Sequence, residues 1–322
     1  MSALAMNLEN SQKSCKNNKV GSENNGFLAS AHSEGVSAIS RSSSEDPLVI
    51  DLAPSDPPDR FELMSGNFYS QKLERLLNGF DPISLSDMDG VSLQNRTDTK
   101  FMFGYGQLIR ALPELAEHYR ILEIEGKRAA AYRSLYFDTG DDLFYNTHQR
   151  GRLNRYKVRC REYVASGLCF LEVKFKNNKK RTIKKRIQTK AFEEHFTPES
   201  SEFLDEVLPF SPDLLKPILW NEFTRITLVH RVDAERLTID IGLKFNNERG
   251  AESVGSLIVG ELKQERFRAS SDFIRIIKRQ SVRPMRMSKY CVGRALLNKR
   301  LRQNKLKVKF KKIQKINDEN SV

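Results

Sequence analysis

Charged and apolar side chains alternate along residues 155–163 and again along residues 171–176. Residues two apart in a strand share a face. One face of these two strands therefore carries almost only charge, from Arg155, Lys157, Arg159, Arg161, Glu172, Lys174 and Lys176. The other face carries Tyr156, Val158, Cys160, Leu171, Val173 and Phe175. This pattern predicts neighbouring strands with one apolar and one strongly basic face.

Rows of like charge on neighbouring strands repel each other, so a basic face of this kind indicates an anionic partner. Two interpretations follow. The face is either a solvated basic surface, such as a nucleic-acid platform, or the inward-facing lining of an antiparallel barrel whose apolar side is covered by helices. The same alternation recurs near Lys100, Lys184, Asp240 and Glu261, and this recurrence favours the inward-facing lining.

The remaining pattern predicts about eight strands with helices between the hairpins. Beyond the two strands above, strands are expected at 95–103, 119–125, 132–139, 182–187, 221–230, 235–243 and 256–267. Helices are expected at 68–77, 106–117, 191–195, 198–208, 271–279 and 288–301, with a helical or irregular bridge at 143–149. The sum predicts an α+β fold, an eight-stranded antiparallel β-tunnel closed as a barrel, with the helices packed outside.

Composition divides the chain into four parts. Residues 1–60 are rich in Ser, Asn, Gly and Pro and are expected to be a disordered N-terminal tail. Residues 61–93 form a short helical lead-in, and residues 94–300 form the tunnel domain. Residues 301–322 form a basic C-terminal tail, either solvated or an electrostatic arm that contacts an anionic surface.

Charge and cysteine usage narrow the class of protein. The 322 residues carry a net charge of +13, and residues 61–298 keep +9 of it. A basic domain indicates an anionic partner such as a nucleotide, polyphosphate, nucleic acid or lipid. The four cysteines show no C-x-x-C spacing, which favours a reduced, cytoplasmic chain. We find no signal peptide and no apolar run long enough to span a membrane.

Nine short motifs occur in an order that resembles a known family. They are Arg96-x-x-x-Lys100, Ser134-Leu-Tyr-Phe-Asp-Thr, Lys157-x-Arg-x-Arg161, Leu171-Glu-Val-Lys174, Lys184-x-Arg186, a strand with Arg225, a strand with Asp240, Glu261-x-Lys263 and Ser288-Lys-Tyr-x-x-Gly293. Together they resemble the VTC domain, the polyphosphate polymerase branch of the CYTH-like triphosphate tunnel metalloenzymes. The resemblance covers about residues 94–300.

The resemblance implies an eight-stranded antiparallel tunnel that transfers the γ-phosphate of ATP to a growing polyphosphate chain. It implies a divalent metal, Mn²⁺ or Mg²⁺, held by Glu261. By resemblance, catalytic side chains would be Lys100, Arg159, Arg161, Lys174, Lys263 and Lys289, and further phosphate ligands would be Arg150, Lys157, Lys184, Arg186 and Arg225. Such cations suit phosphoryl transfer, which needs positioning and charge neutralisation more than covalent help.

Other functions stay open at this point. The same lining would serve an inorganic triphosphatase, or a non-catalytic module that binds polyphosphate or inositol phosphates. Specific nucleic-acid binding is disfavoured because Tyr156 and Tyr163 form no stacking stripe. The segment Glu123-Ile-Glu-Gly-Lys127 spells the E-x-E-x-K signature of the triphosphatase and cyclase branches, but it follows the first helix instead of opening the domain, so we interpret it as structural.

Overall fold

The computed structural model describes residues 67–88 and 96–319, and the predicted N-terminal tail lies outside these residues. Within residues 62–322, one sheet runs through eight strands in the order β2-β11-β9-β8-β4-β5-β6-β7. In chain order these are β2 (Thr97–Gly104), β4 (Ala130–Thr139), β5 (Arg155–Tyr163), β6 (Leu168–Lys176), β7 (Thr182–Thr189), β8 (Leu215–His230), β9 (Glu235–Asn247) and β11 (Leu257–Gln264). Every neighbouring pair along this path is antiparallel. The predicted eight-stranded antiparallel sheet is confirmed.

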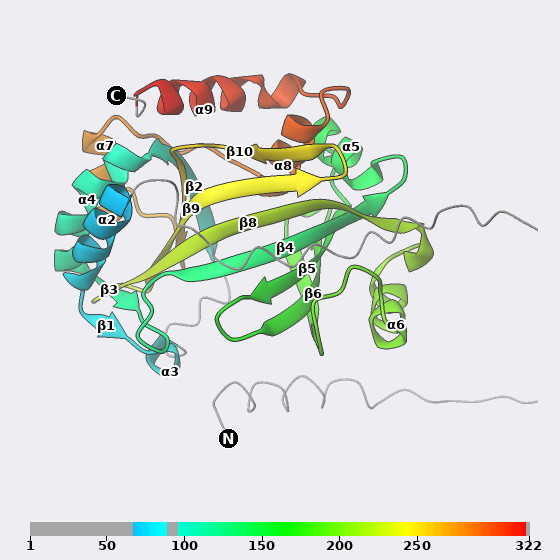
Figure 1. Ribbon diagram of the computed structural model, residues 1–322, viewed down its shortest axis with the longest axis horizontal. Helices are drawn as coiled ribbons and strands as arrows, with labels where there is room; N and C mark the ends of the chain where they lie inside the picture. The colour runs from blue at the N-terminus through cyan, green and yellow to red at the C-terminus, as the bar shows by residue number, and fades with distance from the viewer. Residues whose placement is uncertain (1–66, 89–95, 320–322) are drawn as a thin grey trace, which may run out of the picture. The chain divides into compact units, whose positions relative to one another are not determined.

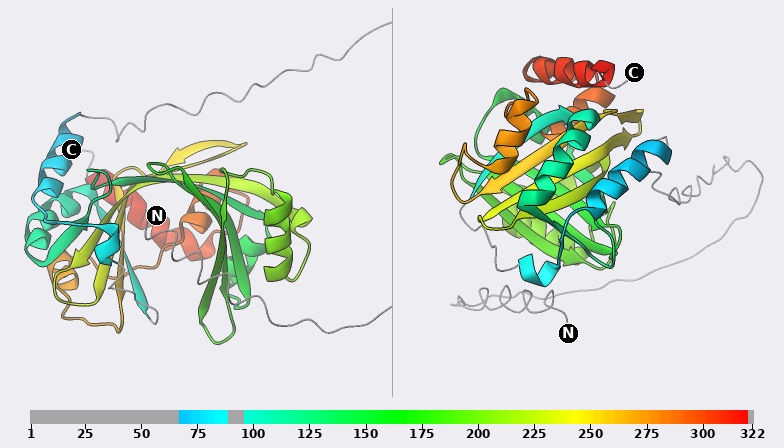
Figure 2. Two further views of the ribbon diagram at one scale, coloured as in Figure 1. Left: turned by 90° about the horizontal axis from the view of Figure 1, so that it is seen from below. Right: turned by 90° about the vertical axis from the view of Figure 1, so that its left-hand side faces the viewer.

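Three short strands join the sheet outside this path. β1 (Pro82–Ile83) pairs in parallel with β3 (Tyr119–Leu122), β3 pairs with β8, and β10 (Gly250–Ser253) extends β9 in a hairpin. The long strands β8 and β4 run across the middle of the domain (Figure 1). The sheet arches, so that the β2–β11 side and the β5–β6 side turn toward the same direction (Figure 2, left). The arch has a convex outer face and a concave inner face.

The arch differs from the expected closed barrel in how its two sides are joined. Its terminal strands are β2 and β7, which are not neighbours in the sheet. The free edge of β2 is instead occupied by a strap, defined here as residues 283–288: Phe101 forms a bridge with Pro284, and the Met285 amide donates to the Lys100 carbonyl at 2.7 Å. At its far end, Ser288 Oγ accepts a 2.8 Å hydrogen bond from Lys157 Nζ of β5. The strap therefore connects the two sides where a ladder was expected.

Three helices cover the convex face of the β2–β8 side. They are α2 (Asn67–Asn78), α4 (Tyr105–His118) and α7 (Asp272–Arg279). Their apolar residues recur at three- and four-residue spacing and meet the outward residues of the strands. The core between them includes Leu112, Leu115, Phe273, Ile226 and Ile239, all almost fully buried. The predicted covering of the apolar side by helices is confirmed here.

The short helix α3 (Leu85–Met88) packs Met88 with Ile83 and Val229, and four further helices pack around a second core. They are α5 (Leu143–Arg150), α6 (Pro198–Val207), α8 (Lys289–Leu297) and α9 (Lys307–Glu319). In α8 a glycine is required, because a Cβ on Gly293 would lie 2.4 Å from the Phe245 ring. This close approach lets α8 pack directly on β8 and β9. The N-terminal end of α8 is thereby held next to the concave face.

Two predicted elements are wrong. Residues 191–195 are not helical, because Phe192 instead stacks on Trp220 with ring centroids 5.1 Å apart, and only Pro198–Val207 forms a helix in this region. Residues 301–322 are not simply a solvated tail: α9 buries Ile313 and Ile316 against the domain. The three-residue spacing of these isoleucines places them on one helical face, which the alternation at 306–313 concealed. None of the described helices is long and apolar enough to cross a bilayer.

Candidate phosphate-binding site

The concave face brings together the charged side chains that the alternating pattern predicts. Residues of adjacent strands meet in direct register there: Lys100 lies opposite Glu261, Arg159 opposite Glu172, and Arg225 opposite Asp240. Three carboxylates therefore lie among many cations. We call Glu172, Asp240 and Glu261 the carboxylate belt.

Glu172 of β6 is held between two neighbouring strands. Arg159 of β5 places Nη2 2.6 Å from one carboxylate oxygen, and Lys184 of β7 pairs with the other. The side chain of Glu172 is only 2% exposed. Burial alone would raise the pKa of Glu172, but Arg159, Arg161 and Lys184 lower it well below the ordinary value. Glu172 is therefore an ionised, fully engaged carboxylate that fixes the Arg159 guanidinium.

Asp240 of β9 links the sheet to α8. Arg225 binds it with two hydrogen bonds, 2.6 Å from Nε to Oδ1 and 2.9 Å from Nη2 to Oδ2, and Lys289 pairs with Oδ2. Lys289 is the first residue of α8, where the helix dipole disfavours a cation. Asp240 offsets this cost. Burial would raise the pKa of Asp240, whereas Arg225 and Lys289 lower it strongly.

Glu261 of β11 pairs with Lys100 through Oε1 and lies 3.6 Å from Lys263 Nζ through Oε2. Its side chain is 17% exposed, more than Glu172 or Asp240. Burial would raise the pKa of Glu261, but Lys100 and Lys263 lower it well below its usual range. Glu261 is the belt carboxylate most accessible to a ligand.

Two rungs of the β5–β6 ladder hold cations with no acid between them. Lys157 lies opposite Lys174, and the next rung outward sets Arg155 opposite Lys176. We call these the open rungs. Like charges directly opposite each other destabilise a sheet. Lys174 is exposed to solvent. Its pKa is lowered by burial and by Lys157, Arg159 and Lys100, and raised by Glu261.

Aromatic rings form the floor under the arginines. The Arg161 guanidinium lies 5.4 Å from the Tyr132 ring centroid, and that of Arg225 lies 5.1 Å from the same centroid. Lys289 Nζ lies 3.9 Å from the centre of the Phe223 ring. Cation–π contact restricts these cations without neutralising them. The donors that Arg225 and Lys289 do not use on Asp240 stay available to an anion. Arg161 also donates to Ser134 Oγ at 3.2 Å.

The pKa values of several lysines on this face fall into the neutral range. Burial lowers the pKa of Lys184, Lys263 and Lys289 to about 8, although Glu172, Glu261 and Asp240 respectively raise it. Tyr136 shows the opposite effect: burial would raise its pKa, but Arg159, Arg161 and Lys157 lower it to about 8. The lowered pKa values mean that the protonated lysines are less stable on this face, in the absence of a ligand, than in water.

Most residues expected at the site lie on the concave face, with one departure. Arg186 of β7 pairs directly with Glu172 and so shares its face, where it is exposed and its guanidinium lies 4.5 Å from the Phe170 ring centroid. Arg150 is exposed at the end of α5, which is not part of the strand lining. Sequence reasoning did not place Tyr132, Tyr136, Ser134 or Ser288 in the site. Tyr132, Ser134 and Tyr136 share one face of β4 by the two-residue period, a signal that was available.

The side chains of the concave face supply only part of the ligand shell that a divalent metal needs. Among residues 67–88 and 96–319 there is no group of three or more metal-ligating side chains. Glu261 is ionised and partly accessible, so it can supply one oxygen ligand, while Mg²⁺ and Mn²⁺ prefer an all-oxygen shell. Phosphate oxygens of a bound substrate would have to supply further ligands. The residues therefore fit a metal that is shared with substrate.

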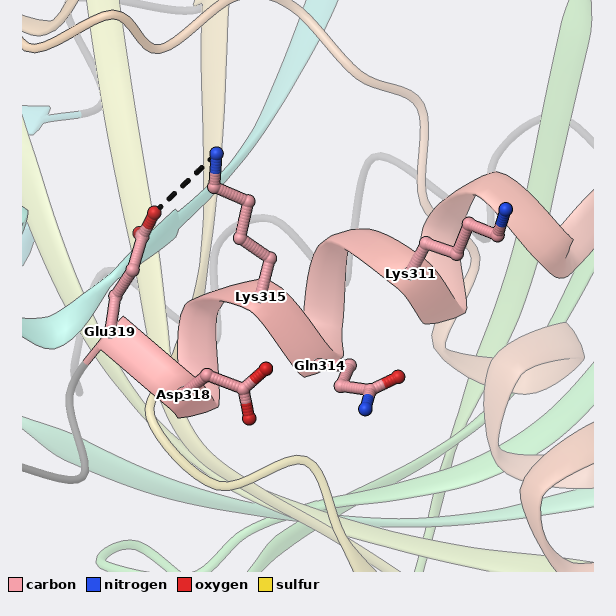
Figure 3. Close-up of a pocket in the computed structure, with 5 residues that line it drawn as sticks. All are labelled: Lys311, Gln314, Lys315, Asp318 and Glu319. Atoms are coloured by element: carbon pink, nitrogen blue, oxygen red, sulfur yellow. Dashed lines mark ion pairs between the residues drawn. The ribbon is translucent and has the colours of Figure 1, made fainter.

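Two other features lie apart from this face. The segment 123–127 forms a tight turn in which Ile124 and Lys127 pair, and Glu123 binds Arg128. A surface depression of about 430 Å³ is lined by α9 alone, through Lys311, Gln314, Lys315, Asp318 and Glu319 (Figure 3). Lys315 and Glu319 pair with each other at 3.6 Å there. Neither feature contains a group of cations without carboxylate partners, as the concave face does.

Comparisons with solved structures give distant similarities. The adenylyl cyclase candidate HpAC1 from Hippeastrum, for which a dominant triphosphatase activity is described, matches with 12% identity and a TM-score of 0.38, covering 62% of this chain and 94% of its own. An adenylate cyclase candidate from Bacillus halodurans matches with 16% identity and a TM-score of 0.39, covering 61% and 96%. The PH1012 protein of Pyrococcus horikoshii matches with 7% identity and a TM-score of 0.32, covering 57% and 88%. At these TM-scores the likeness carries no argument.

No curated protein matches the chain in sequence. The sequence model of the VTC domain, in contrast, matches residues 95–298, which is more than half of the chain. Its bounds coincide within a few residues with the tunnel domain expected at 94–300. They include all eight strands of the path, from β2 to β11, and every cation that pairs with the carboxylate belt. The chain therefore belongs to the VTC domain family.

Proposed function

We propose that this protein is a polyphosphate polymerase that transfers the γ-phosphate of ATP to a polyphosphate chain on the concave face. The observation that carries the proposal is the excess of fixed cations over the carboxylate belt. Each belt carboxylate already binds two cations, and Lys157, Lys174 and Arg161 remain without an acid partner among the described ion pairs. A triphosphate would supply the missing negative charge.

The proposed roles follow from geometry. Arg159 and Arg225 are held rigid by Glu172 and Asp240, so their remaining donors are positioned to bind phosphate oxygens. Lys100, Lys263 and Lys289 would neutralise charge that develops on the transferred phosphoryl group, with Lys184 and Lys174 opposite them. Glu261 would hold the metal, which when bound supplies charge neutralisation between phosphates.

The three described cysteines are free and buried, so we place this activity in a reducing compartment.

Inorganic triphosphate hydrolysis and non-catalytic binding of polyphosphate are the competing functions. All three need the same lining. The polymerase and the triphosphatase differ in the acceptor, and the binding module transfers no phosphoryl group. In the polymerase, a terminal phosphate of the chain takes the place that water takes in the triphosphatase.

The test incubates the purified full chain with ATP and Mn²⁺ or Mg²⁺. Polymerase activity yields chains that an exopolyphosphatase degrades, and one ADP is formed for each phosphate added to a chain. A parallel incubation supplies inorganic triphosphate in place of ATP. Release of free phosphate from inorganic triphosphate, with no chain growth from ATP, would identify an inorganic triphosphatase. Tight triphosphate binding with no turnover at either metal would identify a binding module.

A further inference from the structure

Aromatic side chains continue the concave face on one side of the carboxylate belt. Phe170 lies two residues along β6 from Glu172, and Tyr163 lies two residues along β5 from Arg161, so each shares the face of its neighbour. The two rings contact each other, with centroids 5.8 Å apart and planes at 80°. Tyr163 also contacts Tyr132 of β4, with centroids 5.0 Å apart. Beyond Arg161 the lining therefore changes from cations to aromatic rings.

Two of these rings are not part of the apolar cores. Among residues 67–88 and 96–319, neither Tyr163 nor Phe170 belongs to the clusters in which helices pack against the sheet. Phe170 is 8% exposed, and Tyr163 is partly exposed. Core packing of helices therefore does not account for two large aromatic side chains on the concave face, next to a row of cations.

Two exposed polar side chains of β7 lie beside Phe170. Gln188 is the direct partner of Phe170 across the ladder, and the Arg186 guanidinium lies 4.5 Å from the centre of the ring. Among the ion pairs of the described residues, Arg186 has no carboxylate partner. Glu172 lies directly opposite it, but both of its oxygens already pair with other cations. Arg186 therefore lies on an aromatic ring, exposed, with no acid to bind its donors.

This combination of side chains matches the chemistry that recognises a purine base. Aromatic rings and arginine guanidinium planes both stack on bases. A glutamine amide can bind adenine through two hydrogen bonds, to N6 and N7. At roughly 3.4 Å per residue, the Phe170–Gln188 rung is about 7 Å along the strands from Glu172. This separation leaves room for a ribose between a base at the ring and phosphates at the belt.

We propose that Arg186, Gln188 and Tyr163 form a nucleoside subsite, which binds the purine base of the nucleotide donor while the cations around the carboxylate belt bind its phosphates. The base stacks on the Arg186 guanidinium, and the Gln188 amide binds its edge. This assigns Arg186 to the base and not to a phosphate, as the family resemblance implies. The inference rests on the proposed function and deepens it, because the subsite selects an adenine nucleotide over a pyrimidine nucleotide.

The test measures binding of ATP, CTP and tripolyphosphate to the full chain by calorimetry, at fixed salt and without metal. The wild type is expected to bind ATP about tenfold more tightly than CTP. R186K keeps the charge but loses the planar guanidinium, so ATP affinity falls about tenfold while tripolyphosphate affinity changes less than about twofold. Q188A lowers the ratio of ATP to CTP affinity about threefold or more.

The matched control is R181K, in the turn between β6 and β7, where the arginine is exposed. It makes the same exchange outside the subsite and should leave all three affinities unchanged. Thermal melts of each variant confirm that it is folded.

Three results would overturn the nucleoside subsite. The first is an equal loss of ATP and tripolyphosphate affinity in R186K, which would make Arg186 a phosphate ligand. The second is an unchanged ATP affinity in R186K. The third is a wild type that binds CTP as tightly as ATP, or a ratio that Q188A does not lower. A wild type that binds neither ATP nor tripolyphosphate would contradict the proposed function itself, so the two failures are distinguished.

Discussion

The carboxylate belt and the open rungs carry the same kinds of cation on the same sheet, yet they differ in what neutralises them. Arg159, Arg225 and Lys100 each contact an acid directly across the ladder. Lys157 faces Lys174 and Arg155 faces Lys176. The first arrangement stabilises the unliganded fold and fixes donor geometry. The second costs stability until an anion arrives. The comparison distinguishes cations that a carboxylate fixes in position from cations that face another cation and have no carboxylate partner across the ladder.

The largest expected effect comes from removing the most accessible belt carboxylate. E261Q should reduce metal-dependent turnover of ATP by about 100-fold or more, because the carboxylate that we propose as the metal ligand is lost. Affinity for tripolyphosphate without metal should rise, since a negative charge leaves the concave face. E123Q is the matched control in the E-x-E-x-K turn and should change neither quantity. Wild-type turnover in E261Q would remove Glu261 from the metal site.

The next effect is on stability. R225Q should lower the free energy of unfolding by about 3 kcal/mol, because it leaves Asp240 buried with Lys289 as its remaining cation. R133Q offers a comparison, since Arg133 binds Glu162 on the convex face. Chemical denaturation measures both. A smaller loss for R225Q than for R133Q would mean that the belt pairs do not stabilise the fold.

The open rungs should behave in the opposite way. K174Q should weaken tripolyphosphate binding about tenfold while raising the free energy of unfolding by about 0.5 kcal/mol, because its like-charge contact with Lys157 disappears. K157Q should weaken binding to a similar extent without a gain in stability, because it also removes the hydrogen bond to Ser288 Oγ. K185Q, on the other face of β7, should change the affinity less than twofold. Calorimetry and denaturation of the same samples provide both values. Loss of stability together with affinity in K174Q would make Lys174 a structural cation instead.

The smallest expected effect is on pH dependence. The pKa values of Lys184, Lys263 and Lys289 are lowered by burial to about 8, so these groups lose protons as the pH rises from 7 to 9. Tripolyphosphate affinity should then fall by about threefold to tenfold, with proton uptake on binding near pH 8 to 9. Because these pKa values are lower in the folded than in the unfolded chain, the same lysines make the unliganded protein more stable as the pH rises from about 8 toward 10.5. Affinity that does not change over this range would show that none of the three contacts the anion.

The alternating pattern predicted the strands and the inward face well, because a two-residue period is a local property of each strand. From this pattern we placed Lys100, Arg159, Arg225 and Glu261 on the charged face of their strands. The register between neighbouring strands then brings each of them next to a side chain of opposite charge. The strap and the role of Ser288 could not be predicted in this way, since they depend on contacts between segments more than 100 residues apart. The burial of Ile313 and Ile316 was missed because a run of lysines interrupts the helical period in α9.

The central claim is that the concave face is a receptor for linked phosphates. The most direct measurement is a crystal structure of the full chain with tripolyphosphate. The account predicts an anion inside the arch, with oxygens within hydrogen-bond distance of Arg159, Lys174 and Lys263. An anion seated on the convex face or on α9, with the belt and the open rungs left uncontacted, would contradict it.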